Sequence, residues 1–280
     1  MGLLEFNVWL DAVFTTLWVF VVAFLIFHFI LFVVKGRFRR SFIEGHWPEH
    51  DSRPPATPKV LHGVHMVSMI ILGFTGMYLR FPFFSGGRVP MRTTHYIFMI
   101  IVTVVLVWRV LYAFFSKKNP DYKEFAIRKV DLQSALGVLA YYGYFSDNKP
   151  HVAKYNVLQK MSYNLFLYMM ILQALTGFAL VTVPIVFGLS PRDMLVGWWL
   201  GPLAGSTDLA GWGVRTVHYI FNWLFIIMTT VHLYLAMTVD VPCMLDFFGI
   251  KELQVVEGGH GHGDHDEPAS EPHPLPQTTY

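Results

Sequence analysis

The chain has little charge and almost no cysteine. Only 14% of its 280 residues are charged, whereas 54% are hydrophobic, which is too apolar for a soluble domain. A net charge of only +2 gives no basis for nucleic-acid binding. The single cysteine, Cys243, excludes an internal disulfide, a cysteine-ligated iron–sulfur cluster and a covalently attached c-type haem within this chain. Any iron–sulfur chemistry must therefore belong to a partner.

Five apolar runs are long enough to cross a bilayer, which takes about 20 residues. They cover residues 11–34, 60–80, 95–115, 161–187 and 214–239. The first run carries no charge beyond its opening aspartate and has no small-residue cleavage site after it, so we interpret it as a retained span. The sequence predicts an all-α integral membrane protein with five transmembrane helices, a four-helix bundle plus one extra N-terminal helix.

Basic residues predict the orientation of these spans, because loops rich in Lys and Arg stay on the cytoplasmic side. Loop 35–59 contains six of them and loop 117–160 contains eight. In contrast, loop 187–215 contains two, and none precedes the first span. We therefore expect a periplasmic N-terminus and a cytoplasmic C-terminus in the inner membrane of a bacterium.

Composition divides the chain into parts. From Gly258 on, the tail has few apolar residues and several prolines, which predicts disorder. The segment VDLQSALGVLAYYGYF, before the fourth span, has the spacing of a short amphipathic helix at the inner surface. The expected parts are an extra N-terminal transmembrane helix (1–35), a cytoplasmic loop (36–59), a four-helix domain (60–240) and a cytoplasmic, largely disordered, His-rich tail (241–280).

Two histidines, His218 and His232, lie fourteen residues apart in the last span. Imidazoles inside a membrane span are rare and usually functional. Fourteen residues make nearly four helical turns, so the two rings lie on nearly the same face, roughly 21 Å apart along the axis. One helix thus offers one axial ligand to each of two haems stacked across the bilayer.

The directions of the spans predict the partners of these histidines. His62 opens the second span near the inner surface, and His95 opens the third near the outer surface. We expect His95 and His218 to bind an outer haem, and His62 and His232 to bind an inner haem, in the core of a helical bundle. His65 lies on the same helix face as His62 and is a rival ligand. Packed histidines that bond to carbonyl groups are the alternative, but that alternative does not explain why four histidines agree in depth.

Further residues near the spans are candidates for supporting roles. His28, toward the inner end of the first span, is interpreted as structural, with haem ligation or proton transfer as alternatives. Small residues around Thr75-Gly76 and Thr176-Gly177 allow helices or a flat macrocycle to approach closely. Arginines near the span ends could pair with haem propionates, although snorkelling to the interface is their default interpretation; they are Arg80, Arg92 and Arg215 on the outer side and Arg109 nearer the inner side.

Two stretches resemble the cytochrome b (gamma) subunit of membrane-bound formate dehydrogenases, in the di-haem cytochrome b family shared with nickel–iron hydrogenases. The segment Lys154–Met161 (KYNVLQKM) is similar to the KYNxxQKM entry to a span, and Thr176-Gly177 matches a TG further along. The second stretch is the last span, where His218 and His232 keep the spacing of the family's ligands. The resemblance covers about residues 59–240.

The resemblance implies that the chain is an electron-transfer subunit with two haem b groups, held by the two histidine pairs. A periplasmic catalytic subunit and its iron–sulfur partner would supply electrons to the outer haem. The inner haem would pass them to menaquinone or ubiquinone near the cytoplasmic surface. Asn156 and Gln159 would help line the quinone pocket, since amides can bond a quinone carbonyl. Helix capping by Asn156 and surface exposure of Gln159 are the alternative roles.

The chain departs from this pattern in its extra first span, its longer outer loop 187–213 and its His-rich tail. We hypothesise that the first span substitutes for the membrane anchor that the family's iron–sulfur subunit usually carries. Alternative functions are a hydrogenase cytochrome b subunit and a quinol-driven thiosulfate- or polysulfide-type reductase subunit. The motif HGHGDHD in the tail suggests a divalent-metal transporter. Against that alternative, the spans almost lack Asp and Glu.

Overall fold

The computed structural model describes residues 2–48, 50, 53–117, 120–146 and 155–255. Within these ranges the chain is helical, and the one departure from helices and loops is an isolated bridge between Val186 and Leu189. The prediction of an all-α membrane protein is confirmed. The tail from Gly258, which is predicted to be disordered, lies outside the described residues. The start of the predicted tail (241–280) is ordered instead, since Val241–Phe247 form a helix.

Five long helices build the fold. Four of them are long and apolar enough to cross a membrane, namely α1, α2, α3 and α7. The fifth, α5, contains Ser162, Asn164 and Gln173, which lower its mean hydropathy, but it packs against α7 within the same bundle. The bounds are α1 Leu3–Val34, α2 Ala56–Arg80, α3 Arg88–Phe115, α5 Val157–Phe178 and α7 Thr207–Val239.

The predicted extension of the fourth span to residue 187 is wrong, because α5 ends at Phe178. Pro184 lacks the amide proton that a helix needs and disfavours the helical conformation of the residue before it. The chain instead turns, and Arg192 N–H donates to the Val181 carbonyl at 3.1 Å. The outer loop therefore begins nine residues, about two and a half helical turns, before the predicted end of the span, and Pro184 within it keeps the helix from continuing there.

Short helices connect the long ones. The predicted amphipathic helix is present as α4, which lies between α3 and α5 in the chain and packs against α5. The short elements, with α4 among them, are a π-helical turn η1 Arg39–Ile43, a 3-10 turn η2 Tyr122–Phe125, α4 Lys129–Tyr142, a π-helical turn η3 Asp193–Gly197, α6 Leu200–Ala204 and α8 Val241–Phe247.

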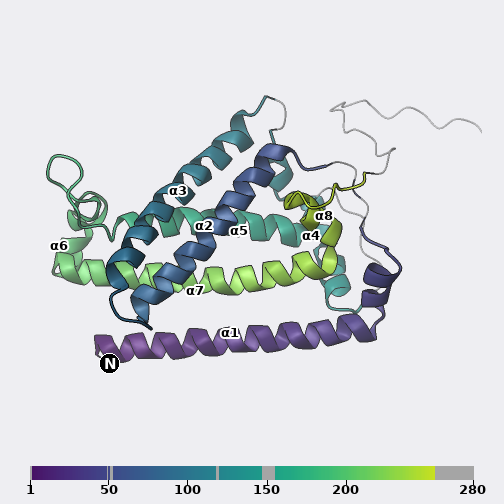
Figure 1. The fold of residues 1–280 in the computed structure, drawn as a ribbon, viewed down its shortest axis with the longest axis horizontal. Coiled ribbons are helices and arrows are strands. Elements are labelled where there is room, and N and C mark those ends of the chain that lie inside the picture. The colour runs from purple at the N-terminus through teal and green to yellow at the C-terminus, as the bar shows by residue number, and fades with distance from the viewer. Residues whose placement is uncertain (1, 49, 51–52, 118–119, 147–154, 256–280) are drawn as a thin grey trace, which may run out of the picture.

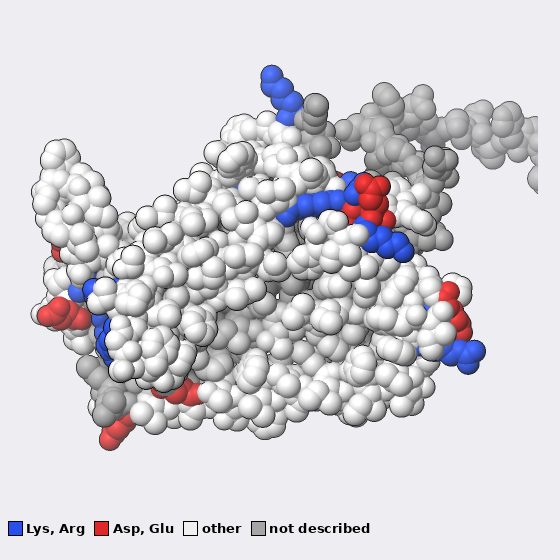
Figure 2. Space-filling view, in the orientation of Figure 1, with Lys and Arg blue, Asp and Glu red and all other residues white. Residues whose placement is uncertain are grey.

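Four of the long helices form two pairs, and α1 packs beside one of them. Figure 1 shows α5 and α7 lying along each other, with α2 and α3 crossing them obliquely as a second pair. Helix α1 lies along the other side of α7 and runs in the same direction. On the face drawn in Figure 2, charged side chains gather toward the ends of the molecule and leave the middle free of charge, as expected for helices that cross a bilayer.

Helix α1 is attached to the bundle by specific polar contacts. The Asp11 carboxylate accepts a bond from Arg80 at 2.7 Å and another from the Tyr219 hydroxyl at 2.5 Å. Further along, the Trp18 indole N–H donates to Thr230 Oγ1 at 3.2 Å. Because polar contacts in a membrane cannot be replaced by water, they hold α1 at one register on α7.

Candidate functional site

The histidine pair predicted for the outer side comes together in the structure. His95 in α3 and His218 in α7 face each other with ring centroids 6.4 Å apart. Two metal–imidazole bonds of about 2 Å each, together with the radii of the two rings, span about 6 Å. The separation therefore suits one metal ion held between the two rings, as in a haem with two axial histidines.

A threonine orients the first of these rings. Thr75 Oγ1 donates to the Ile71 carbonyl at 2.7 Å and lies 2.8 Å from His95 Nδ1. Because the threonine proton is already used, the oxygen accepts and His95 Nδ1–H donates. The lone pair of His95 Nε2 is then left for a metal, and a ligand histidine usually has its other nitrogen bonded in this way.

The same arrangement recurs on the partner ring. Thr176 Oγ1 donates to the Leu172 carbonyl at 2.8 Å and lies 2.9 Å from His218 Nδ1. The Gln173 amide nitrogen lies 3.3 Å from His218 Nε2. An amide nitrogen can only donate, so Nε2 accepts in this conformation, and a metal bound to Nε2 would replace the amide contact. Both outer rings thus present Nε2 as an acceptor.

The glycine after each threonine lets the ring approach its helix. A Cβ at Gly76 would lie 3.5 Å from His95 Cε1, and a Cβ at Gly177 would lie 3.3 Å from His218 Cε1. The two Thr-Gly pairs are therefore matching cradles, one in α2 and one in α5. From the sequence we expected small residues at these positions, but not their hydroxyl bonds to histidine. The repeat of Thr-Gly in two spans is the signal that would have revealed them.

The inner pair has the same ring separation as the outer one. His62 in α2 and His232 in α7 lie with ring centroids 6.4 Å apart. Aromatic edges border both rings, because Phe247 of α8 lies 5.4 Å from His62 and Phe166 of α5 lies 6.1 Å from His232. These apolar neighbours suit a flat, hydrophobic macrocycle.

The rival ligand, His65, points elsewhere. Its ring lies by the backbone of Val102 in α3, away from the face on which His62 meets His232. Its Nε2 is buried and has no hydrogen-bond partner among the described residues. The structure thus brings His62, rather than His65, to the inner pair.

Two of the candidate arginines are engaged in ion pairs. Arg80 pairs with Asp11 of α1, as described above, and its guanidinium also lies over the Tyr219 ring at 4.9 Å. Arg109 forms a two-bond pair with Asp121, at 3.2 and 2.7 Å. The remaining two, Arg92 and Arg215, are exposed. Pairing of these four arginines with haem propionates stays a prediction.

The two amides expected near the quinone form a helix cap. Asn156 Oδ1 accepts from the Gln159 backbone N–H at 3.0 Å, and Gln159 Oε1 accepts from the Asn156 N–H at 3.0 Å. This reciprocal pair satisfies two backbone donors at the start of α5. Asn156 is buried, and its side-chain nitrogen reaches the Tyr142 hydroxyl at 3.3 Å. A role in quinone binding stays a prediction for both.

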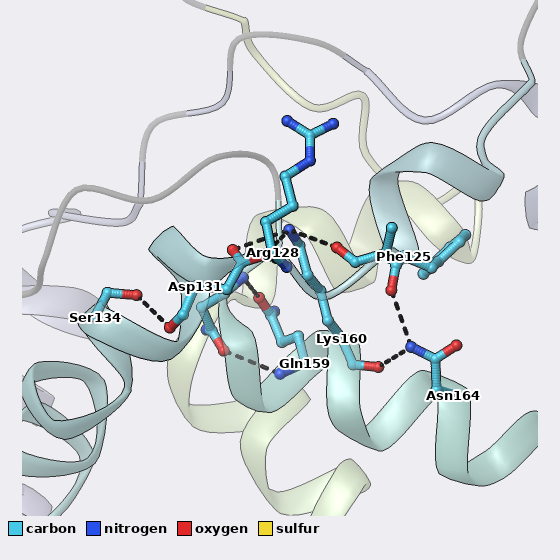
Figure 3. Close-up of polar contacts among 9 residues, drawn as sticks. Phe125, Arg128, Asp131, Ser134, Gln159, Lys160 and Asn164 are labelled. Atoms are coloured by element: carbon cyan, nitrogen blue, oxygen red, sulfur yellow. Dashed lines mark hydrogen bonds and ion pairs between the residues drawn. The ribbon is translucent and has the colours of Figure 1, made fainter.

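A buried ion pair holds α4 against α5 just after this cap (Figure 3). Lys160 Nζ donates to both carboxylate oxygens of Asp131, at 3.0 and 2.8 Å, and both side chains are buried. Burial raises the pKa of Asp131, but bonds from Lys160 and from the Arg128 backbone N–H outweigh it and leave the pKa below its ordinary value. Lys160, the second lysine of the KYNVLQKM segment, thus has a structural partner that the sequence did not reveal.

A second cluster of charges fixes α8 beside the inner pair. Asp246 is almost completely buried and binds both Lys59 and Arg53, the latter at 2.8 Å. Although burial raises the pKa of Asp246, the bonds from these two cations hold it below its ordinary value. Because Phe247 follows Asp246, this cluster also sets the position of the ring that borders His62.

His28 lies in a hydrogen-bond network between three elements. Its Nδ1 lies 2.6 Å from the Tyr234 hydroxyl of α7, and its Nε2 lies 2.8 Å from the backbone oxygen of Tyr142 in α4. Both ring nitrogens are therefore engaged with protein groups, and the partner Tyr234 follows His232 of the inner pair by two residues. A divalent-metal transporter would need a site for its ion. Within the described ranges, no group of three or more His, Cys, Asp or Glu could hold a metal ion. The motif HGHGDHD lies outside those ranges.

Comparison with known proteins identifies the family. Residues 55–242, well over half of the chain, match the family model described as prokaryotic cytochrome b561. No curated protein and no solved structure matches the chain. The matched region contains both histidine pairs and begins after α1. The chain therefore belongs to the prokaryotic cytochrome b561 family of haem b-binding electron-transfer proteins of the inner membrane.

Proposed function

We propose that the chain is a di-haem membrane subunit that carries electrons between a periplasmic iron–sulfur partner and the quinone pool. The observation that supports this is the equal separation of 6.4 Å in two histidine pairs that share α7. Haem b, when bound, supplies one-electron transfer. His95 and His218 would hold the outer haem, and His62 and His232 the inner one.

The residues around each pair would prepare the site for its haem. Thr75 and Thr176 keep the outer rings in the tautomer that offers Nε2, so little reorganisation is needed on binding. The aromatic edges of Phe166 and Phe247 exclude water beside the inner pair. A dry, aligned site of this kind favours electron transfer over side reactions.

The orientation follows from the distribution of basic residues, with the N-terminus periplasmic and the C-terminus cytoplasmic. Quinone would then be reduced on the cytoplasmic side, taking two electrons from the bundle and two protons from the cytoplasm. Asn156 and Gln159, at the start of α5, lie on that side. Each electron that crosses contributes to the membrane potential, about 2.3 kcal/mol per 100 mV.

The partner proposed by resemblance is a formate dehydrogenase-like pair of an iron–sulfur and a catalytic subunit. A hydrogenase, or a thiosulfate- or polysulfide-type reductase driven by quinol, would use the same scaffold. Helix α1 packs on α7 through Asp11 and Trp18. This packing supports the proposal that α1 takes the place of a partner's membrane anchor.

Haem content of the purified protein tests the proposal. We expect a dithionite-reduced spectrum with b-type bands and two haems per chain in the pyridine haemochrome assay. Replacement of His218 or His232 by alanine should each remove one haem, while His46→Ala, at an exposed position after α1, should keep both. A single haem in the wild type, or haem that stays after both α7 substitutions, would contradict the assignment.

Electron exchange with quinol tests the proposed link between the haems and the quinone pool. Protein in liposomes, oxidised beforehand, is mixed with a short-chain naphthoquinol, and haem reduction is followed by absorbance. We expect rapid reduction of the inner haem in the wild type. Haem that binds normally but is not reduced by naphthoquinol or ubiquinol would rule out the quinone-linked role.

A further inference from the structure

A cavity lies where the end of α1 meets the ends of α4 and α7. Its volume is about 270 Å³, and its walls include His28 from α1, Ser41 and Trp47 from the segment after α1, Tyr144 after α4 and Thr238 from α7. Segments from three distant parts of the sequence thus enclose one space. The family match begins at residue 55, so two of these segments, including His28, precede it.

The hydrogen bonds of His28 define its role at the wall. Its Nε2 faces the Tyr142 carbonyl at 2.8 Å, so Nε2 carries the proton. Its Nδ1 is therefore an acceptor with a single lone pair. Two phenol hydroxyls compete for that lone pair, Tyr234 at 2.6 Å and Tyr144 at 3.3 Å. The shorter bond belongs to Tyr234, and the Tyr144 hydroxyl is also hydrogen-bonded to the Tyr234 oxygen. An oxygen of a bound ligand would replace Tyr234 as the acceptor of the Tyr144 proton.

Tyr144 is also held in an unusual backbone conformation. Its φ is +61°, and within the described part of the chain only Phe187 is another non-glycine residue with positive φ. Such a conformation is unfavourable and is retained where the surroundings hold it in place, often at binding sites. Here the Arg37 guanidinium lies over the Tyr144 ring at 4.6 Å and over the Tyr141 ring at 4.0 Å.

Arg37 stiffens this wall further by bonding the backbone around Tyr144. Its two terminal nitrogens donate to the carbonyls of Tyr141 and Ser146, each at 2.8 Å. Burial raises the pKa of the Tyr144 phenol, so its hydroxyl keeps its proton near neutral pH and remains a donor. The wall is thus rigid, aromatic and equipped with an O–H group.

The shape and chemistry indicate the class of ligand. Aromatic side chains form much of the lining, among them Phe32, Trp47 and Tyr141. A volume close to the lower end of ligand pockets, about 300 Å³, suits a ring-sized head group better than a branched lipid head group with its chains. A flat ring with an oxygen acceptor would stack on these walls and accept a bond from Tyr144.

The cavity is also close to the inner histidine pair. Thr238 in its wall follows His232 by six residues on α7, about 9 Å along the helix axis. Asn156, expected near the quinone, donates to the hydroxyl of Tyr142, which lines the same cavity.

We propose that this cavity, closed by α1, binds the quinone head group, with the Tyr144 hydroxyl donating to a quinone oxygen and His28 positioning that hydroxyl. The assignment rests on the proposed quinone-linked function and specifies its site. It makes α1 part of the binding site rather than only an anchor.

Binding of a quinone-site inhibitor to the purified haem-loaded full chain tests the assignment. The probe is 2-heptyl-4-hydroxyquinoline N-oxide, whose fluorescence falls when it binds. Tyr144→Phe removes one hydroxyl and should weaken binding about tenfold. Ser41→Trp fills the cavity and should abolish binding. The matched control, Trp18→Phe, loses another α1–α7 hydrogen bond outside the cavity and should bind within twofold of the wild type.

Haem content, measured on each variant, distinguishes loss of the site from loss of the fold. A variant with full haem and weak binding supports the assignment, and His28→Phe provides a second test if Ser41→Trp does not fold. Full-strength binding by haem-loaded Tyr144→Phe and His28→Phe would overturn the site while leaving the proposed function intact. Failure of the haem-loaded wild type to bind the probe or accept electrons from quinol would instead contradict the proposed function and the site together.

A second readout addresses the main competing occupant, an anionic phospholipid attracted by the nearby arginines. Native mass spectrometry counts the lipids retained by the wild type and by Ser41→Trp. If Ser41→Trp loses a phosphatidylglycerol and still binds the N-oxide normally, the cavity holds a lipid head group and the proposal is wrong.

Discussion

Thr75 Oγ1 and His95 Nδ1 lie 2.8 Å apart, and the threonine proton is directed to the Ile71 carbonyl rather than to the histidine. The bond therefore runs from histidine to threonine and fixes the imidazole tautomer. Thr176 and His218 repeat the relationship at 2.9 Å. Helices α2 and α5 thus each carry a hydroxyl that accepts a bond from one ring of the outer pair and leaves the Nε2 of that ring for a metal.

Thr75→Val and Thr176→Val test whether these hydrogen bonds favour haem binding, since valine keeps the shape of threonine and removes the acceptor oxygen. We expect the outer haem to bind about 10- to 100-fold more weakly, as is usual when a ligand histidine loses its hydrogen-bond partner. Haem titration of the apoprotein, followed by absorbance, measures the change. Thr103→Val is the control, because Thr103 bonds only to the Met99 carbonyl of its own helix. Equal losses in all three variants would refute the role of the two histidine contacts.

His62 and His65 differ in what they face, although they lie three residues apart. We expect His62→Ala to lose the inner haem and His65→Ala to retain two haems, because only the His62 ring meets His232. Pyridine haemochrome stoichiometry distinguishes the two variants. Loss of a haem from His65→Ala, with His62→Ala unaffected, would reverse the assignment.

Gly177 leaves room for the His218 ring. A Cβ there would lie 3.3 Å from His218 Cε1, tighter than ordinary contact, and the two γ-carbons of valine would press further on the ring. We expect Gly177→Val to lower the content of outer haem and to shift its midpoint potential in a redox titration. Gly73→Val is the matched control, since a Cβ at Gly73 meets nothing within 4 Å. A normal outer haem in Gly177→Val would show that the close approach is unimportant.

Removal of only one partner from the buried pair of Asp131 and Lys160 should strongly lower the free energy of unfolding. Lys160→Met leaves an unpaired buried carboxylate and should destabilise the fold by about 3–5 kcal/mol. Adding Asp131→Leu should recover most of that loss, because an apolar pair of similar size is usually tolerated. Thermal unfolding in detergent, followed by circular dichroism, measures both changes. A double variant as unstable as Lys160→Met alone would contradict the argument.

The same pair predicts a pH dependence. The folded pKa of Asp131 lies below its ordinary value, so its stabilisation is fully present above the unfolded pKa, about 3.9. It is lost as the pH falls through the lower folded pKa. The difference in melting temperature between the wild type and Asp131→Leu/Lys160→Met should therefore change only below about pH 4. A difference that changes between pH 6 and 8 would point to another group.

Much of the fold could be predicted because membrane spans are encoded locally. The bilayer thickness sets a minimum apolar length, and the helical repeat places His218 and His232 on one face of α7. The helical segment α4 was also visible in its apolar spacing. The end of α5 was predicted too late, because the apolar run continues to residue 187 whereas the helix ends at Phe178, and apolar composition does not report where a backbone leaves the helical conformation.

The sequence by itself determined that this is a helical membrane protein with histidines at matching depths, because length and periodicity are properties of one segment at a time. Only the tertiary structure decided which face of α2 meets α7, and with it that His62 rather than His65 reaches His232. It also decided the bonds that the two outer histidines make to Thr75 and Thr176, and the cavity closed by α1. These depend on how separate helices cross, and crossing is set by the packing of whole surfaces rather than by the pattern within any one helix.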